Sequence, residues 1–267
     1  MVGVLNVTPD SFSDGGRFLD PGAAVEHALR MASEGADLVD VGGESTRPGA
    51  PRVPEEEELA RVIPVLQALA RSRFPVPVSI DTSKAAVARA ALDAGASLVN
   101  DVRALADPEM ARVVAGSGAP VVLMHMRGTP GDMRERATYH DLVAEVRAEL
   151  AAAMARAEAA GVARERIVLD PGIGFAKTAG QSVEILARLP ELLSLGRPLL
   201  VGPSRKSFIG ALTGAPPEER LPGTLAAVAA AVLGGATFIR VHDVAASRQA
   251  VLVAVALRAS GQSGTRV

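Results

Sequence analysis

The sequence predicts a single (β/α)8 (TIM) barrel domain over residues 1–267, with its active site at the C-terminal ends of the strands. Three observations support this fold class. Eight short apolar runs alternate with helical stretches, and no linker divides the chain. Nearly every run ends in a polar or charged residue. The 267 residues, 48% of them hydrophobic, are enough for the large core that eight strand–helix units need.

Three segments with a common pattern mark the change from a helix to a buried strand. They read GADLVD (35–40), GASLVN (95–100) and GATFIR (235–240), and each follows an alanine-rich stretch. Glycine often stops a helix, and a continuous apolar run after it is typical of a parallel strand that is covered on both faces. Five less regular strands are expected at 2–6, 76–81, 119–125, 166–170 and 197–202.

Helical stretches separate the predicted strands. We expect helices at about 21–35, 55–72, 84–94, 108–117, 140–160, 181–194, 205–213 together with 223–233, and 244–259. Strict alternation of eight strands with helices is the expectation for a barrel. A doubly wound open sheet is the alternative, but it usually has fewer strands, and no G-x-G-x-x-G pattern follows the first strand.

Composition and charge argue against several classes of protein. The formal net charge is −2, with 28 basic and 30 acidic residues scattered along the chain, so no basic stripe suggests a nucleic-acid partner. The chain has no cysteine, which excludes disulfides and thiolate metal sites. No apolar run reaches the roughly 18 residues of a membrane span, and no secretory signal is visible. We therefore expect a soluble cytoplasmic protein without nucleic-acid or membrane partners.

The polar residues that close the predicted strands form the candidate site. They are Asn6, Asp40, Asp81, Asn100, His125, Asp170, Ser204 and Arg240. A barrel brings all eight C-terminal strand ends to one face, around one pocket. A single polar strand end is often only the start of a turn. Eight of them, with carboxylates, amides and cations mixed, are better explained as a ring of functional groups.

Asp81, Asp170 and Asn100 predict the class of ligand. A carboxylate matches a pair of adjacent N–H donors, so two carboxylates and an amide suit a heterocycle rich in amino and ring N–H groups. The alternative for each aspartate is capping of the helix that follows it, which SIDTSK and VLDPG both permit. Capping is less expected for Asp170, because Pro171 and Gly172 make a turn there.

A second group of residues suits a diphosphate. Arg240 and His242 alternate along IRVHD and therefore point to the same side of a strand. With Asn6 and the hydroxyl of Thr46, they are what a diphosphate and its Mg²⁺ would require. Mg²⁺ keeps most of its waters and would take the amide oxygen of Asn6 and phosphate oxygens for the rest.

Lysine usage separates a site candidate from other basic residues. Only three of the 28 basic residues are lysines, namely Lys84, Lys177 and Lys206. Lys206 follows small turn residues in GPSRKSFIG, where a cation at a helix start opposes the helix dipole and needs a compensating role. Lys177 is expected at the surface or in a lid. The glutamates at 55–58 are expected to be the favourable negative first turn of a helix.

Two long loops and the strand end at Met124 and His125 are further candidates for the site. The stretches at 6–16 and 42–54 are rich in Gly, Pro and Ser, as movable covers of a site would be. His125 is ambiguous, with a structural role favoured, and its neighbour Met124 is expected to line the pocket.

Eight motifs resemble the dihydropteroate synthase family from end to end. They are GVLNVTPDSFSDGG, DVGGESTRPGA, SIDTSK, VNDV, LMHMRG, LDPGIGFAKT, VGPSRKSFIG and IRVHD. The first, second, sixth and seventh are long and specific, whereas VNDV or SIDTSK alone would be weak. The resemblance implies a homodimeric sulfonamide target that condenses 4-aminobenzoate with (7,8-dihydropterin-6-yl)methyl diphosphate. The products are 7,8-dihydropteroate and diphosphate, in folate biosynthesis.

The resemblance also implies roles at the matching positions. The pterin would be held by Asp81, Asn100, Asp170 and Lys206, with Arg240 stacked near it and Met124 lining the pocket. Asn6 would meet Mg²⁺ at the diphosphate, which Thr46, Arg47, Arg240 and His242 would bind. The aminobenzoate would be bordered by Thr46, Arg47, Pro48, Phe175 and Ser204.

The implied reaction needs no nucleophilic side chain, because the aniline nitrogen attacks the methylene carbon directly. The protein holds the leaving group and stabilises charge. Loss of diphosphate leaves a cation spread over the pterin, which Asp81, Asp170 and Asp14 would stabilise. We therefore expect a largely dissociative step.

Two alternatives remain at this point. A methyltransferase that passes a methyl group from methyltetrahydrofolate to a corrinoid would share the barrel and the Asp/Asn contacts, but it would not need SRKS or the RVH grip on diphosphate. A catalytically silent relative that only binds pterins should have lost Asn6, Arg47 or His242, and all three are present.

Overall fold

The computed structural model describes residues 1–8, 21–47 and 49–263. Within them, eight parallel strands form one sheet in the order β6-β5-β4-β3-β2-β1-β8-β7. The strands are β1 Val2–Asn6, β2 Leu38–Gly42, β3 Val78–Asp81, β4 Leu98–Asp101, β5 Val121–Met124, β6 Ile167–Asp170, β7 Leu200–Val201 and β8 Phe238–Val241. A parallel bridge between Leu169 and Leu199 joins the two edges, so the predicted barrel is confirmed.

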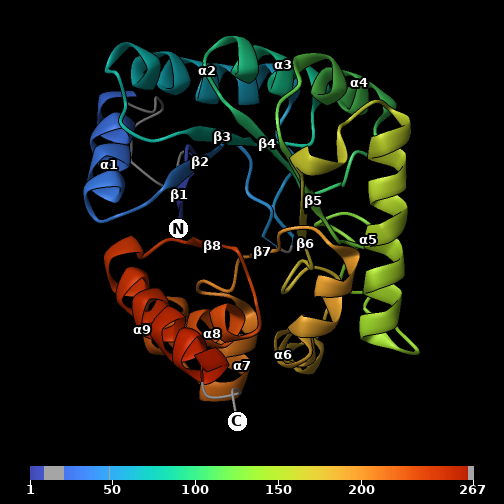
Figure 1. The fold of residues 1–267 in the computed structure, drawn as a ribbon. Helices are drawn as coiled ribbons and strands as arrows, with labels where there is room; N and C mark the ends of the chain where they lie inside the picture. Colours follow the sequence, from blue (N-terminus) through green and yellow to red (C-terminus); the bar gives the residue numbers. More distant parts are fainter. Residues whose placement is uncertain (9–20, 48, 264–267) are drawn as a thin grey trace.

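The helices lie outside the strands, as Figure 1 shows. They are α1 Pro21–Ser33, α2 Glu55–Arg71, α3 Ala85–Asp93, α4 Pro108–Ser117, α5 Leu142–Ala159, α6 Ala179–Ala187, α7 Ser207–Thr213, α8 Leu221–Leu233 and α9 Val244–Ser263. The described residues also contain three short 3₁₀ helices: η1 Arg164–Arg166, η2 Leu189–Leu195 and η3 Pro217–Glu219. In the part of the chain that is described, no helix is long and apolar enough to cross a membrane.

The three glycines at the helix-to-strand transitions stop their helices as the sequence predicts. Gly35, Gly95 and Gly235 have φ values of +98°, +108° and +98°, which only glycine adopts without strain. The N–H of Gly35 donates to Ala32, and the next N–H, of Ala36, reaches back to Met31 at 2.9 Å. This pair of bonds is the Schellman arrangement, and it turns the chain directly into the following strand.

One predicted helix is wrong in its extent. The helix expected at 181–194 is interrupted at Arg188, with α6 before it and the 3₁₀ helix η2 after it. Pro190 explains the interruption, because it has no N–H to donate to the turn before it and its ring crowds that turn.

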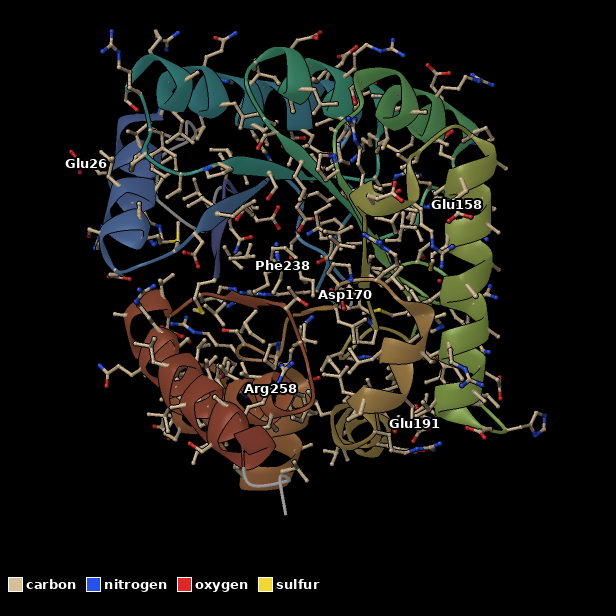
Figure 2. All side chains as sticks on the ribbon, viewed as in Figure 1. Glu26, Glu158, Asp170, Glu191, Phe238 and Arg258 are labelled. Carbon is tan, nitrogen blue, oxygen red and sulfur yellow. The ribbon has the colours of Figure 1, made fainter. Side chains whose placement is uncertain are left out.

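Side chains inside the barrel form two layers, because every second residue of a strand points inward. The lower layer is apolar and contains Val2, Leu38, Leu98, Val122, Val168, Leu200 and Phe238. Two residues further along five of these strands, the chain places Asp40, Asn100, Met124, Asp170 and Arg240, which together we call the polar layer. Figure 2 shows Asp170 and Phe238 near the centre of the ring of helices, whereas Glu26, Glu158 and Glu191 lie at its outside. The polar layer is therefore the floor of the candidate site.

Candidate active site

Arg240 is the centre of the polar layer. Its Nε donates to Asp40 Oδ2 and its Nη2 donates to Asp81 Oδ2, both at 2.7 Å. Both acids are buried, and the side chain of Arg240 is partly exposed. The side chains come from β2, β3 and β8, which the pairing of β8 with β1 brings round to one another. Two charge-assisted bonds fix the guanidinium in one orientation.

Asp40 holds the other polar groups in place, a role that sequence reasoning missed. Its side chain accepts bonds from Ser79 Oγ at 2.6 Å and from Asn100 Nδ2 at 2.9 Å, as well as from Arg240. Because the Asn100 amide donates to Asp40, its oxygen Oδ1 remains as the acceptor. The available signal was an acid in the middle of the apolar run LVDVG, two positions before the strand ends.

The acids of the site have raised pKa values. Burial raises the pKa of Asp81 to about 7, although the charge of Arg240 opposes the shift. Burial likewise raises the pKa of Asp170 to about 6, against the hydrogen bond that it accepts from the backbone of Gly172. Removing a carboxylate from water disfavours its charged form, and a ligand that brings N–H donors restores favourable contacts to it.

Asp170 ends β6 and bends the chain into the loop that follows. Its Oδ1 accepts a bond from the N–H of Gly172 at 2.7 Å. Gly172 has φ of +68°, and a Cβ there would lie 2.0 Å from the carbonyl oxygen of His125, so glycine is required. The N-caps of the following helices are Lys84 for α3 and Thr178 for α6. The capping alternative therefore fails for both Asp81 and Asp170.

Lys206 is the residue directly before α7. Its Nζ is 3.9 Å from the centre of the Phe175 ring, a cation–π contact. Desolvation lowers the pKa of Lys206 to about 8, and the charges of Arg240 and Arg47 add to the shift, whereas Asp170 and Asp81 oppose it. Lys206, Asp170 and Asp81 therefore share one electrostatic environment.

Ser204 and His242 form a pair at the mouth of the barrel. Ser204 Oγ lies 3.0 Å from His242 Nδ1 and accepts the backbone N–H of His242 at 3.2 Å. Burial lowers the pKa of His242 to about 4, and the charge of Arg240 adds to this, so the ring is neutral near pH 7. If the hydroxyl donates to Nδ1, the ring proton is held on Nε2, where it can serve an anion.

The remaining predicted residues lie at or beyond the ends of β1 and β2, or outside the described residues. Asn6 ends β1 and is half-buried, and Thr46 and Arg47 follow β2 in the β2–α2 loop. The side chain of Arg47 is exposed, yet its charge reaches Lys206. Asp14 and Pro48 lie outside the described residues, as does most of the first predicted cover loop.

Comparison with known proteins settles the family. The family model described as Pterin binding enzyme matches residues 2–242. The chain belongs to the pterin-binding enzyme family. It is 52% identical over 259 residues to the dihydropteroate synthase of a Synechocystis species. The alignment covers 96% of this chain and 89% of that protein.

Solved structures of pterin-binding enzymes have the same barrel. A Yersinia pestis dihydropteroate synthase with a sulfonamide drug matches with a TM-score of 0.91 and 48% identity, over 97% of this chain and 94% of the other. The Xanthomonas albilineans dihydropteroate synthase with 4-aminobenzoic acid matches with a TM-score of 0.90 and 51% identity, over 97% and 92% of the two chains. These matches confirm the predicted family and its barrel fold.

Lys177 of this pterin-binding enzyme is buried, so the expectation of a surface or lid residue is wrong. Its Nζ lies 2.9 Å from His125 Nδ1 and donates to the carbonyl of Phe175 at 3.1 Å. His125 Nε2 in turn lies 3.0 Å from Glu149 Oε2. Burial lowers the pKa of Lys177 to about 7. The lysine therefore ties β5 to the loop that carries Phe175, and His125 has the structural role that the sequence favoured.

Glu58 corrects the interpretation of the glutamates at 55–58. Three of them are exposed at the start of α2, but Glu58 is fully buried and paired with Lys84. A signal was present, because Glu58 precedes Val62, Val65 and Leu69 with the spacing of one buried helix face.

Proposed function

We propose that the chain is a dihydropteroate synthase, which condenses 4-aminobenzoate with (7,8-dihydropterin-6-yl)methyl diphosphate to give 7,8-dihydropteroate and diphosphate in folate biosynthesis. One observation carries the proposal. Two buried carboxylates and an amide on the barrel floor lie beside two cations, Lys206 and Arg240, and a neutral histidine, His242. This is a polar heterocycle site next to an anion site.

The floor would bind the pterin. Asp81 and Asp170 would accept its ring and amino N–H groups, and the Asn100 oxygen would accept a further one. Lys206 would donate to a pterin acceptor, and Arg240 would lie against the ring, with Met124 lining the pocket. The burial of these acids supports this assignment, because a ligand with N–H donors offsets the unfavourable desolvation of the ionised carboxylates.

The reaction would proceed without a nucleophilic side chain and without a covalent enzyme intermediate. The lone pair of the aniline nitrogen forms the C–N bond to the methylene carbon, and the C–O bond electrons leave with the diphosphate. The proton on the nitrogen is then lost to solvent. His242, Arg240, Thr46 and Arg47 would hold the departing diphosphate, and Asp81, Asp170 and Asp14 would stabilise positive charge on the pterin in a largely dissociative step.

The residues present fit Mg²⁺ only together with the substrate. In the part of the chain that is described, no group of three or more His, Asp or Glu side chains could hold a metal ion. Asn6 is a single neutral oxygen donor at the end of β1. Mg²⁺ retains water readily and takes phosphate oxygens, so Asn6, water and diphosphate would complete its shell, and it would supply Lewis-acid stabilisation of the leaving group.

The aminobenzoate would lie outside the pterin, bordered by Phe175, Ser204, Thr46, Arg47 and Pro48. Phe175 and Ser204 support this placement, since they flank Lys206 and His242 at the open end of the barrel. We include sulfonamide competition with 4-aminobenzoate in the proposal, because the Yersinia pestis relative was solved with such a drug.

Diphosphate release from the dihydropterin diphosphate tests this function. The assay is run with and without 4-aminobenzoate, in Mg²⁺ and again in EDTA. We expect release that needs Mg²⁺ and dihydropteroate only when aminobenzoate is present. Tight pterin binding with no release under any condition would mean a silent relative, and methyl transfer from methyltetrahydrofolate to a corrinoid would favour the methyltransferase alternative.

A homodimer, a single domain over 1–267 and a cytoplasmic location complete the proposal. Exposed apolar side chains gather on the outer helices α8 and α9, which lie side by side in Figure 1: Leu233, Leu252, Val253, Val255 and Leu257. Exposed apolar side chains on neighbouring outer helices support association with a second copy. Light scattering coupled to size-exclusion chromatography tests the dimer, and fractionation of host cells tests the location.

A further inference from the structure

Lys84 makes two ion pairs that the proposed reaction does not use. It lies directly before α3, three residues after Asp81, and its side chain is 8% exposed. Its Nζ contacts one carboxylate oxygen of Glu58 and one of Glu44. Glu58 projects from α2, and Glu44 is the second residue after β2. One buried cation therefore joins α3, α2 and the beginning of the β2–α2 loop.

The desolvation free energy of the buried Lys84–Glu58 pair indicates that the two charges have a role beyond stability. Glu58 is completely buried, and its second oxygen, Oε1, has no hydrogen-bond partner among the described residues. Buried charges are desolvated at high cost, and apolar side chains of similar volume often stabilise a fold equally well. Stability alone does not explain why Lys84 and Glu58 are charged. Their charges are needed if the purpose is to hold the third member, Glu44.

The backbone before Glu44 is held from the same side. Arg61 of α2 donates to the carbonyl oxygen of Gly43 at 2.6 Å. A Cβ on Gly43 would lie 2.8 Å from Val62 and 3.0 Å from Glu58, so this segment packs directly on α2. Two successive residues, Gly43 and Glu44, are thus fixed by charged groups. Thr46 and Arg47 follow two and three positions later, and the charge of Arg47 reaches Lys206.

We propose that Lys84, through Glu44, is a positioning residue. It fixes the position of Thr46 and Arg47 at the part of the site that would bind 4-aminobenzoate and diphosphate. The inference rests on the proposed function. It assigns Lys84 and Glu44 to the binding of 4-aminobenzoate and diphosphate, and not to the binding of the pterin ring. A loop root held by charges keeps the following residues within the small tolerance that reaction geometry allows.

The principal variant is Glu44→Ala, because it releases the loop and leaves the buried Lys84–Glu58 pair intact. We expect the KM for 4-aminobenzoate to rise about tenfold, with pterin affinity unchanged within twofold and the melting temperature nearly unchanged. Amide hydrogen exchange at residues 43–47 should accelerate about tenfold. Glu109→Ala is the matched control, since it removes a glutamate that pairs with Arg89 and Arg112 on the exposed surface.

A second variant tests the lysine without leaving a charge alone in the core. Lys84→Met combined with Glu58→Met removes both buried charges, and we expect it to reproduce the rise in KM and the faster exchange at 43–47. These measurements are made at pH 8, where Asp81 is mainly ionised with or without the nearby charge of Glu58.

The outcomes separate this inference from the proposed function. Wild-type exchange at 43–47 in Glu44→Ala would overturn the inference, whether or not the parent protein has synthase activity. Equal losses for pterin and aminobenzoate, together with a lower melting temperature, would also overturn it, because they indicate a structural role only. A parent without synthase activity would overturn the proposed function, and faster exchange in the variant would still support the loop-anchoring contact.

Discussion

Arg240 donates to Asp81 across the inside of the barrel, with 2.7 Å between Nη2 and Oδ2. The two residues are 159 positions apart in sequence. The bond places a fixed cation beside a buried carboxylate on the floor of the candidate site, and Asp40 holds that cation from its other side. Under the proposed function, pterin binding at this floor depends on the acids, on their protonation and on the groups that orient them.

Asp81→Asn tests the contribution of the carboxylate charge. The amide can still accept a bond from Arg240, so we expect the fold to be kept. A hydrogen bond to a charged group contributes about 2 kcal/mol, so pterin affinity should fall roughly 30-fold. Calorimetry with a pterin ligand measures the loss. Asp37→Asn, at an exposed pair with the N-terminal amine, serves as control. An affinity within twofold of the parent would count against a role for Asp81.

Asp40→Asn tests the group that sequence reasoning missed. Asp40 accepts from Ser79, Asn100 and Arg240 at a position that is 1% exposed. Breaking one partner of a buried charged pair costs about 3 kcal/mol of the free energy of unfolding, and Asn100 and Arg240 should lose their orientation. We expect a lower midpoint in urea and weaker pterin binding. Ser79→Ala removes a single neutral donor and should cost only about 1 kcal/mol. Equal effects of the two variants would contradict the central role of Asp40.

Pterin binding should weaken as the pH falls from 8 to 5. The pKa values of Asp81 and Asp170 are raised to about 7 and about 6, so both acids take up protons in this range and lose the charge that attracts N–H donors. Below each pKa, affinity should fall roughly tenfold per pH unit for each group that must stay ionised. Asp170→Asn should bind more weakly at pH 8 and lose the step near pH 6. A pH-independent dissociation constant would contradict the assignment.

The same two acids should affect stability in the opposite direction. Because their folded-state pKa values are raised, their contribution to the free energy of unfolding is complete below about pH 4 and is lost as the pH rises through about 6 and 7. In the absence of ligand, Asp170→Asn should therefore gain stability relative to the parent between pH 5 and 8. Urea denaturation at the two pH values measures this difference. A constant difference between the proteins would show that the burial of Asp170 does not shift its titration.

Ser204→Ala tests the orientation of His242. Without the hydroxyl, no donor holds the proton of the imidazole on Nε2, so we expect the KM for the pterin diphosphate to rise about fivefold, the equivalent of about 1 kcal/mol. Ser204→Thr keeps the hydroxyl and should restore most of the affinity. Nitrogen-15 chemical shifts of the ring report the tautomer directly. The pKa of His242 is lowered to about 4, so no titration of this ring should appear between pH 6 and 8.

Most of the fold and the polar strand ends of the candidate site could be predicted from local signals. The three Gly-Ala transitions stop their helices where expected, because a Schellman end needs only glycine and a short apolar run. The error at 181–194 also has a local cause, because Pro190 in the sequence already indicates that the helix is interrupted there. For Asp81 helix capping stayed open as an alternative, because both uses place an aspartate at a strand end, whereas the Pro171–Gly172 turn already argued against capping by Asp170.

Long-range contacts account for what was missed. Nothing in the sequence around Lys177 distinguishes a buried structural lysine from a lid residue, because its partner His125 lies 52 positions away. Asp40 was recognised as polar, but its three donors come from other strands. Glu58 was hidden among three exposed glutamates, although the phase of the helix placed it on the buried face.

The sequence by itself determined the alternation of strands and helices, the barrel class, the family and the ring of polar strand ends, because each depends on residues close together in the chain. Only the tertiary structure decided how those polar residues pair. Pairing of β8 with β1 brings Arg240 to Asp40 and Asp81, and packing of α2 on α3 buries Glu58 against Lys84. A charged side chain takes its role from the partner it meets in space, and that partner is set by the closed barrel.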